Sequence, residues 1–176
     1  MTSDPRYNLD PFGAHTDEEL WGVLEAVQLR PLVEGFAARL EEQVEENGSN
    51  FSVGQRQLVC IARALLLDPQ ILMLDEATAS IDTETDAVLQ GMIRHEFSTQ
   101  TVISIAHRLD TIIDYDRIMV LDEGRLVEFD TPERLLADAG GVFAKMVASR
   151  EGATGHLSEM AKQAAAQKRA QNAAPE

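Results

Sequence analysis

Cysteine is almost absent from this sequence. Cys60 is the single cysteine among 176 residues, so no disulfide can form within the chain, and a reducing compartment is expected. Long apolar runs are also absent, since none approaches the roughly 20 residues that a membrane-spanning helix needs. The first residues, Met-Thr-Ser-Asp-Pro-Arg, lack the apolar core of a signal peptide. We therefore expect any membrane role of the protein to depend on something outside this chain.

Positive charge is scarce as well. Lys and Arg number 15 against 30 Asp and Glu, which gives a net charge of −15. Contacts with nucleic acid phosphates need Lys and Arg, so this balance argues against nucleic acid as a partner. The acidic run Glu41, Glu42, Glu45 and Glu46 is interpreted as a solvated face rather than a docking patch. With 44% hydrophobic and 26% charged residues, the composition is typical of a soluble globular domain or a large piece of one.

Helical periodicity dominates the first 66 residues. Thr16 followed by Glu19 predicts a capping box. The helix that it opens would bury apolar residues at helical spacing, namely Leu20, Trp21, Leu24 and Val27. A second helical stretch is predicted over 32–40, after Pro31. A loop over 47–50 then precedes a helix capped by Ser52, in which Cys60 is expected to be a small buried apolar residue. One face of that helix would carry Leu58, Ile61, Ala62, Leu65 and Leu66.

The pattern changes to that of an α/β sheet after residue 67. Unbroken apolar or β-rich runs over 71–74 and 101–105, separated by a helix, predict a βαβ unit with strands buried on both faces. The segments 118–121 and 126–129 flank a turn and predict a hairpin. Thr131 and Pro132 open a last helical region. Residues 151–176 are rich in Ala, Gln and Lys without a sustained apolar face, and we predict a low-complexity tail.

An acidic pair, Asp75-Glu76, follows the first predicted strand. Carboxylates at the end of a buried strand are unfavourable unless a metal ion or another group compensates their charge. In open α/β sheets, ligands bind at the carboxyl ends of the strands. Asp75 could hold Mg²⁺, often through water, and Glu76 could orient and activate an attacking water. Taken alone, four apolar residues and an acidic pair are a weak indication.

Further polar positions surround this pair in the sequence. The segment 51–57 leads from a loop into a helix N-terminus, where free N–H groups and the positive end of the dipole form a ready anion site. Ala79-Ser80-Ile81-Asp82 follows the acidic pair, and His107 ends the second predicted strand. A lone histidine is more often structural than catalytic, but its place at a strand's carboxyl end favours a functional role.

These residues, in this order, resemble the ATP-binding cassette family. Phe51 to Gln55 resembles the signature motif, usually Leu-Ser-Gly-Gly-Gln, and Ile71 to Asp75 resembles the Walker B strand. Glu76 resembles the catalytic glutamate, Ser80 to Asp82 the D-loop, and His107 the switch histidine. The resemblance runs from about residue 7 to residue 147, so it covers most of the chain.

Within the family, the chain is most similar to subfamily C, the multidrug-resistance-associated exporters. Asn8-Leu9-Asp10-Pro11-Phe12 and the segment 52–58 resemble the second of that subfamily's two cassettes. The fold implied is an incomplete α/β cassette of the P-loop NTPase (RecA-like) type. The resemblance places a helical signature subdomain in 1–66, the C-terminal part of the ATPase core in 67–150 and the tail in 151–176.

The resemblance also implies a function. Two cassettes close head to tail on two ATP molecules, and the signature of one reaches the γ-phosphate held by the other. The implied roles are nucleotide contact for Ser52, Val53, Gly54 and Gln55, a D-loop role for Ser80 and Asp82, support of Mg²⁺ for Asp75, polarisation of water for Glu76, and a γ-phosphate contact for His107. The implied partners are a second cassette and the transmembrane domains of a transporter, with the cassette on the cytoplasmic face of a membrane.

Two departures from the family pattern carry consequences. Val53 replaces the usual glycine, and a β-branched residue neither enters positive φ readily nor lets its backbone approach phosphate. We therefore expect the site served by this signature to bind ATP but hydrolyse it slowly. The P-loop motif Gly-x-x-x-x-Gly-Lys-Ser/Thr does not occur in the sequence, which contains no Gly-Lys pair. The chain alone is therefore not expected to hydrolyse ATP, although the parent protein would be a transporter ATPase.

Three interpretations of the missing P-loop were weighed. The favoured one is a fragment of an exporter cassette, whose Walker B strand would leave an open apolar edge. The second is a stand-alone, non-hydrolysing module that presents its signature face to an intact cassette. The third is a soluble cassette ATPase of chromosome maintenance or translation, but the sequence shows neither the long coiled coils nor the tandem cassettes of those families. The transported substrate cannot be inferred, because in this family the transmembrane domains choose it.

Overall fold

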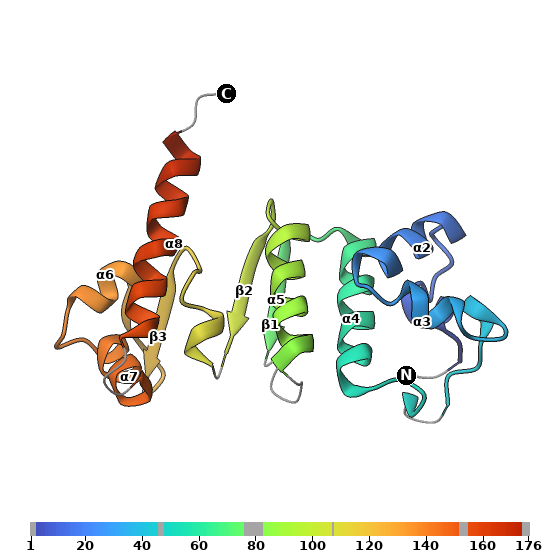
Figure 1. The fold of residues 1–176 in the computed structure, drawn as a ribbon, viewed down its shortest axis with the longest axis horizontal. Helices are drawn as coiled ribbons and strands as arrows, with labels where there is room; N and C mark the ends of the chain where they lie inside the picture. The colour runs from blue at the N-terminus through green and yellow to red at the C-terminus, as the bar shows by residue number, and fades with distance from the viewer. Residues whose placement is uncertain (1–2, 46–47, 76–82, 107, 152–154, 174–176) are drawn as a thin grey trace. The chain divides into compact units, whose positions relative to one another are not determined.

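The computed structural model describes residues 3–45, 48–75, 83–106, 108–151 and 155–173 (Figure 1). The chain divides into two compact units, Met1–Ile105 and Ala106–Glu176. None of the helices in the described ranges is long and apolar enough to cross a membrane.

The first unit begins with short helices that lead to a long one. Its helical elements are α1 (Pro5–Leu9), α2 (Asp17–Ala26), α3 (Arg30–Glu34), the 3₁₀ turn η1 (Arg39–Glu41) and α4 (Val53–Leu67). The capping box of α2 is confirmed: the Thr16 hydroxyl accepts from the Glu19 N–H at 3.4 Å, and the Glu19 carboxylate accepts from the Thr16 N–H at 2.7 Å. Leu20, Leu24 and Val27 are buried as predicted, and Trp21 is half-buried against the same core.

The helix predicted over 32–40 is wrong in its bounds. Helix α3 starts at Arg30 and already ends at Glu34, and Pro31 lies in its first turn. Proline is tolerated there because the first N–H groups of a helix have no partner within it. Arg39, the first residue of the 3₁₀ turn η1, adopts a φ of 53°, and this left-handed conformation excludes a continuous α-helix through residue 40.

The predicted βαβ unit is confirmed. Strand β1 (Ile71–Asp75) pairs in parallel with β2 (Thr101–Ile105), and α5 (Thr83–Glu96) connects them. Leu72 and Leu74 are buried in the unit's core, but Ile71 and Met73 are 58% and 74% exposed. The expectation of burial on both faces is therefore wrong for these strands, because in the described part of the first unit the helices supply apolar contacts to one face only.

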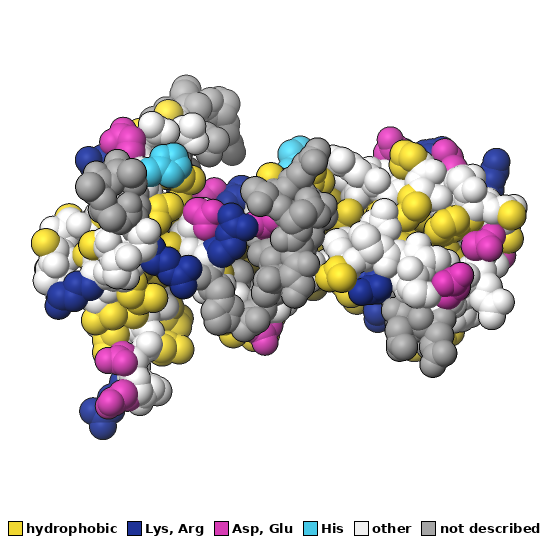
Figure 2. All heavy atoms as spheres, turned by 60° about the horizontal axis from the view of Figure 1, so that its bottom comes forward, with side chains coloured by type: hydrophobic (Ala, Val, Ile, Leu, Met, Phe, Trp, Pro, Cys, Tyr) yellow, Lys and Arg dark blue, Asp and Glu magenta, His cyan; other side chains and the backbone are white. Residues whose placement is uncertain are grey.

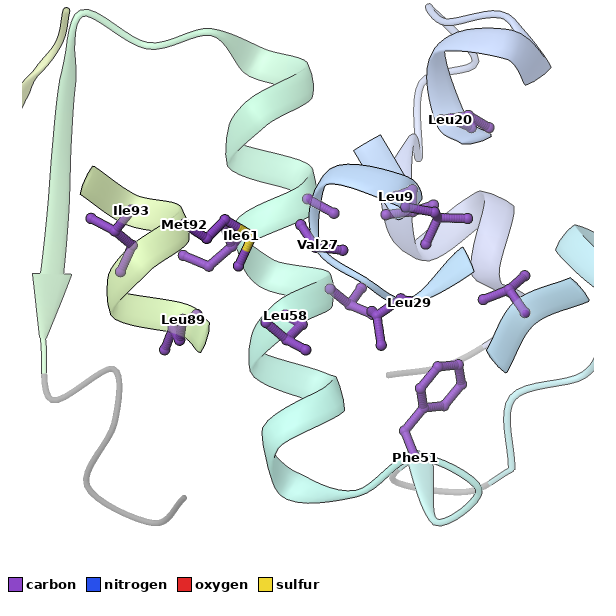
Figure 3. Packing of buried hydrophobic residues seen from close by; sticks show 14 of the residues in the cluster. Leu9, Leu20, Val27, Leu29, Phe51, Leu58, Ile61, Leu89, Met92 and Ile93 are labelled. Atoms are coloured by element: carbon purple, nitrogen blue, oxygen red, sulfur yellow. The ribbon is translucent and has the colours of Figure 1, made fainter. Parts of the chain in front are cut away.

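One apolar cluster joins the helices to the sheet in this unit. Leu89, Met92 and Ile93 of α5 belong to the same cluster as Leu58 and Ile61 of α4 (Figure 3). Cys60 is exposed, which corrects the expectation that it is buried. At 100° per residue, position 60 points away from the side of α4 that carries the buried cluster.

The second unit is a hairpin covered by helices. Its elements are the 3₁₀ turn η3 (Leu109–Thr111), the strands β3 (Ile118–Asp122) and β4 (Arg125–Asp130), and the helices α6 (Pro132–Ala137), α7 (Val142–Glu151) and α8 (His156–Ala173). The predicted hairpin is confirmed, since β3 and β4 pair antiparallel. Glu123 and Gly124 have φ values of 46° and 75°, as a tight hairpin turn requires. The Thr131 hydroxyl caps α6, and Pro132 occupies its first turn as predicted.

Helix α8 occupies most of the segment for which the composition predicts a tail. It has 18 residues, and near its start Leu157 and Ala161 are buried at 8% and 2% exposure. Further along, the Lys168 ammonium lies 2.6 Å from an Asp116 carboxylate oxygen, and the Arg169 guanidinium lies 2.5 Å from that of Glu133. This helix therefore packs without a sustained apolar face. A few apolar contacts hold its start, and two ion pairs hold its later turns.

Candidate functional site

The start of α4 carries the segment that resembles a signature motif. Ser52 is the N-cap of this helix, and its hydroxyl accepts from the Gln55 N–H at 3.1 Å. The Gln55 side-chain oxygen in turn accepts from the Ser52 N–H at 2.8 Å. The two residues thus form a capping box, which the spacing of a serine and a glutamine three positions apart makes possible.

This arrangement leaves donor groups at the helix N-terminus. The N–H groups of Val53 and Gly54 are the first two of α4 and have no acceptor within the helix. Ser52 and Val53 are exposed, Gln55 is half-buried and Gly54 is buried. The Ser52 hydroxyl accepts one hydrogen bond and can still donate its own proton. Together with the positive end of the helix dipole, these groups can bind an anion such as a phosphate.

The loop before α4 is fixed by apolar and polar contacts that sequence reasoning missed. The Phe51 ring is 2% exposed and packs edge-on against Phe36, with ring centroids 5.6 Å apart. Figure 3 shows this ring pointing from its loop toward Leu29, which directly precedes α3, and toward α1, which carries Leu9. The Arg56 guanidinium donates to the carbonyls of Gly48 and Phe51 at 3.1 and 2.9 Å. The sequence indicates residues 51 and 56 only as members of the motif.

The backbone of Val53 does not adopt the positive φ that would require a glycine. Val53 is the first residue of α4 and is not among the residues with positive φ, so a valine fits its backbone without strain. The left-handed conformation expected of a glycine is therefore not required here. The Val53 side chain still has a steric effect, because it is 43% exposed beside the free N–H groups. Any ligand approaching them meets this branched side chain.

The structure places only one residue of the predicted metal and catalytic set. Asp75 ends β1, where it is exposed and is the register partner of Ile105 at the end of β2. The carboxyl ends of both strands therefore lie at the same edge of the parallel pair. Glu76, Ser80, Asp82 and His107 lie outside the described residues, and their predicted roles stay predictions. An exposed carboxylate fits Mg²⁺, which takes one or two carboxylates and completes its shell with phosphate and water.

The segment Asn8 to Phe12 has a structural role that its sequence did not reveal. The Asn8 side-chain amide donates to the Asp4 carbonyl at 2.8 Å, and Leu9 is 4% exposed in the core. Asp10 is buried, and its carboxylate accepts from the His15 N–H at 2.7 Å. The segment thereby folds the turn between α1 and α2, while Phe12 is 88% exposed.

Two opposing effects set the pKa of Asp10. Burial raises it, but hydrogen bonds from the backbone N–H groups of His15, Ala14 and Phe12 lower it by more, and the nearby His15 ring adds to this. The pKa of Asp10 therefore lies below its ordinary value of 3.8. The carboxylate is ionised at neutral pH and organises the turn as an acceptor of several N–H groups.

Comparison with known proteins gives the same assignment as the motifs. The ABC transporter family matches residues 3–79. The chain is 53% identical over 164 residues to mouse ATP-binding cassette sub-family C member 4, covering 93% of this chain and 12% of that protein. It is 54% identical over 143 residues to the Caenorhabditis elegans multidrug resistance protein mrp-7, covering 81% of this chain and 9% of that protein. A bacterial Atm1-family ABC exporter solved with ATP bound aligns with a TM-score of 0.77 and 34% identity, over 88% of this chain and 27% of that one.

The chain belongs to the ATP-binding cassette family, and its fold corresponds to part of a P-loop NTPase-like cassette. Within the family it is a cassette segment of subfamily C, related to the multidrug-resistance-associated transporters. The chain spans 12% of the length of the mouse relative and 9% of the nematode one. The stand-alone module weighed above receives no specific support from these comparisons.

Proposed function

We propose that this chain is the C-terminal part of a nucleotide-binding domain that couples ATP binding and hydrolysis to transmembrane export of organic solutes or conjugates. The observation that carries the proposal is the N-terminus of α4, where the Ser52 hydroxyl and the N–H groups of Val53 and Gly54 are donors available to an anion, in a segment that resembles the cassette signature. The parent protein would hold it on the cytoplasmic face of a membrane, attached to transmembrane domains.

The proposed chemistry divides between the start of α4 and the residues that follow strands β1 and β2 in the sequence. Ser52, Val53, Gly54 and Gln55 would contact the γ-phosphate of an ATP molecule held by a second cassette, with the Ser52 hydroxyl and the free N–H groups as donors. This donor set stabilises the negative charge of the transferring phosphoryl group.

Residues after the strands would complete the site for the ATP held by this cassette. Asp75 would support Mg²⁺ through water, Glu76 would polarise the attacking water, and His107 would hold the γ-phosphate. Bound Mg²⁺ neutralises phosphate charge in such sites. Ser80 and Asp82 would form the D-loop between the two cassettes. We retain the proposed division into a signature subdomain (1–66), the ATPase core (67–150) and a C-terminal segment (151–176) that contains α8.

Substitutions in the full-length protein test the proposal. Glu76→Gln keeps the size of the side chain but removes the carboxylate, and Ser52→Ala removes the hydroxyl donor. Steady-state ATP turnover should fall by at least tenfold in Glu76→Gln and severalfold in Ser52→Ala. Arg63→Lys, at an exposed position further along α4, is the matched control and should be unchanged. Turnover equal to wild type in both Ser52→Ala and Glu76→Gln would contradict the proposal.

A further inference from the structure

The Arg56 side chain, near the start of α4, holds the loop that precedes this helix. One nitrogen of its guanidinium, Nη1, donates to the carbonyl oxygens of Gly48 at 3.1 Å and Phe51 at 2.9 Å, and the side chain is partly buried. The Gly48 carbonyl also accepts from the Phe51 N–H at 2.9 Å. Gly48 itself has a φ of 70°, which suits glycine and aims its carbonyl into this turn. The arginine thus closes the loop that leads into Ser52.

These carbonyls matter because of where the loop leads. Carbonyl oxygens carry partial negative charge, and near the start of α4 they would oppose an incoming phosphate. Hydrogen bonds from a guanidinium compensate this charge and direct the carbonyls toward Arg56. The same arginine contributes its backbone N–H to the Ser52 carbonyl at 3.0 Å, so it belongs to the first turn that the capping box defines.

The side chains on the two sides of Ser52 have different partners. Phe51 is held by Phe36 in the core, and Gln55 is held by the Ser52 N–H. The Phe51 carbonyl and the Ser52 N–H belong to the same planar peptide group. Gln55 accepts from the N–H of this group and Arg56 donates to its carbonyl, so the two side chains hold the peptide at both of its polar atoms. Of the two side chains, only Arg56 also ties this peptide to the Gly48 carbonyl in the loop.

We propose that Arg56 is a positioning residue for the signature segment: by holding the carbonyls of Gly48 and Phe51, it keeps the Ser52 hydroxyl and the N–H groups of Val53 and Gly54 arranged for a phosphate. The proposal rests on the proposed function of residues 52–55. Arg56 touches no reacting atom in this account, and its effect passes through the loop.

Amide hydrogen exchange on the 176-residue chain, read by NMR, tests the structural step. The Ser52 and Phe51 amides donate to Gln55 and Gly48, so their exchange reports whether loop and cap stay formed. Arg56→Met should speed exchange of both amides about tenfold, the order expected when a charge-assisted hydrogen bond is lost. Arg56→Lys keeps a donor that can bridge both carbonyls and should restore part of the protection. Exchange unchanged in Arg56→Met would overturn the proposal.

Turnover and nucleotide affinity of the full-length protein test the functional step. Arg56→Met should lower kcat for ATP severalfold, by no more than Ser52→Ala does, with ADP affinity within twofold of wild type, because ADP lacks the γ-phosphate that the segment contacts. Arg56→Lys should recover at least a third of the lost turnover. Arg63→Met, an exposed arginine on the same helix, should match wild type. A merely structural arginine would instead lower the binding of ATP and ADP alike.

Ser52→Ala separates failure of this inference from failure of the proposed function. If Ser52→Ala lowers turnover and Arg56→Met does not, the segment acts on ATP but Arg56 does not position it. If Ser52→Ala leaves turnover unchanged, the proposed function of the segment fails, and the positioning role fails with it. Should Arg56→Met not fold, Arg56→Lys and Arg56→Gln provide the same comparison, and wild-type kcat in Arg56→Gln would overturn the proposal.

Discussion

The stability of the first unit should depend strongly on the aromatic pair beneath the signature segment. Phe51 is 2% exposed and meets Phe36 edge-on, with an interplanar angle of 79° and 5.6 Å between centroids. The signature motif of the family usually has leucine at this position, so Phe51→Leu is an informative change. We expect it to keep the fold and to lower the free energy of unfolding.

The magnitude follows from the two contributions that leucine loses. An edge-to-face aromatic pair contributes about 0.5–1.5 kcal/mol beyond its buried area. Imperfect filling of the aromatic site adds less than about 1.5 kcal/mol. We therefore expect a loss of about 1–2 kcal/mol in Phe51→Leu, against about 3–5 kcal/mol in Phe51→Ala, which leaves a cavity. With a urea slope of about 1.5 kcal/mol/M, the unfolding midpoint of Phe51→Leu should fall by about 1 M.

Tryptophan fluorescence during urea unfolding is the appropriate assay. The chain has one tryptophan, Trp21, and it packs against the core of the first unit, so its signal reports that unit alone. A double-mutant cycle with Phe36→Leu isolates the ring contact and should give a coupling of about 0.5–1.5 kcal/mol. A coupling near zero, or a fall of less than about 1 kcal/mol in the free energy of unfolding in Phe51→Ala, would refute the proposed contribution of the Phe51–Phe36 contact.

Four further predictions concern other parts of the chain. The folded-state pKa of Asp10 lies below its ordinary value of 3.8, so its contribution to stability is present at neutral pH and is lost as the pH falls through and below that value. Asp10→Asn should therefore be less stable than wild type in urea at pH 7 and should lose less stability than wild type between pH 5 and 3. A pH dependence equal to that of wild type would contradict this. Lys168→Met removes hydrogen bonds to the Asp114 carbonyl and the Asp116 carboxylate. Because the Lys168 and Asp116 side chains are solvent-accessible, the free energy of unfolding should fall by less than about 1 kcal/mol. Amide exchange in the last turns of α8 should become faster, and Lys162→Met is the control. Val53→Gly should raise ATP turnover of the full-length protein by opening access to the N–H groups of α4, and no gain would count against the steric argument. The purified chain should show no ATP turnover, and magnesium-dependent hydrolysis by it would contradict the assignment.

The parts of the fold that depend on local pattern could be predicted from the sequence. The caps at Thr16 and Ser52 follow from residue type and spacing, and the hairpin turn at Glu123-Gly124 follows from its flanking strands. The parallel pairing of β1 with β2 follows from two β-rich runs separated by a helix. In each case, contacts within a few residues or one repeating pattern decide the structure.

The remaining features depend on contacts that sequence spacing does not encode. Helix α3 already ends at Glu34, and Arg39 adopts positive φ, which no turn motif indicated. Helix α8 is held by ion pairs between Lys168 and Asp116 and between Arg169 and Glu133, residues more than 30 positions apart.

The candidate site divides in the same way. The motif indicated Ser52 and Gln55, whose capping box is local. The role of Arg56 could not be inferred, because it depends on the path of the loop between Gly48 and Phe51. The strands were expected to be buried on both faces, but exposed Met73 shows that a run of apolar residues does not reveal what covers the second face.

The most direct test of the central claim is an immunoblot of the native source cells with an antibody raised against residues 151–176. We expect a band many times larger than the 19.4 kDa of this chain, because we propose that the cassette segment belongs to a full transporter polypeptide. A blot that shows a band near 19.4 kDa and no larger band would contradict the claim. It would favour a short protein that binds an intact cassette in trans.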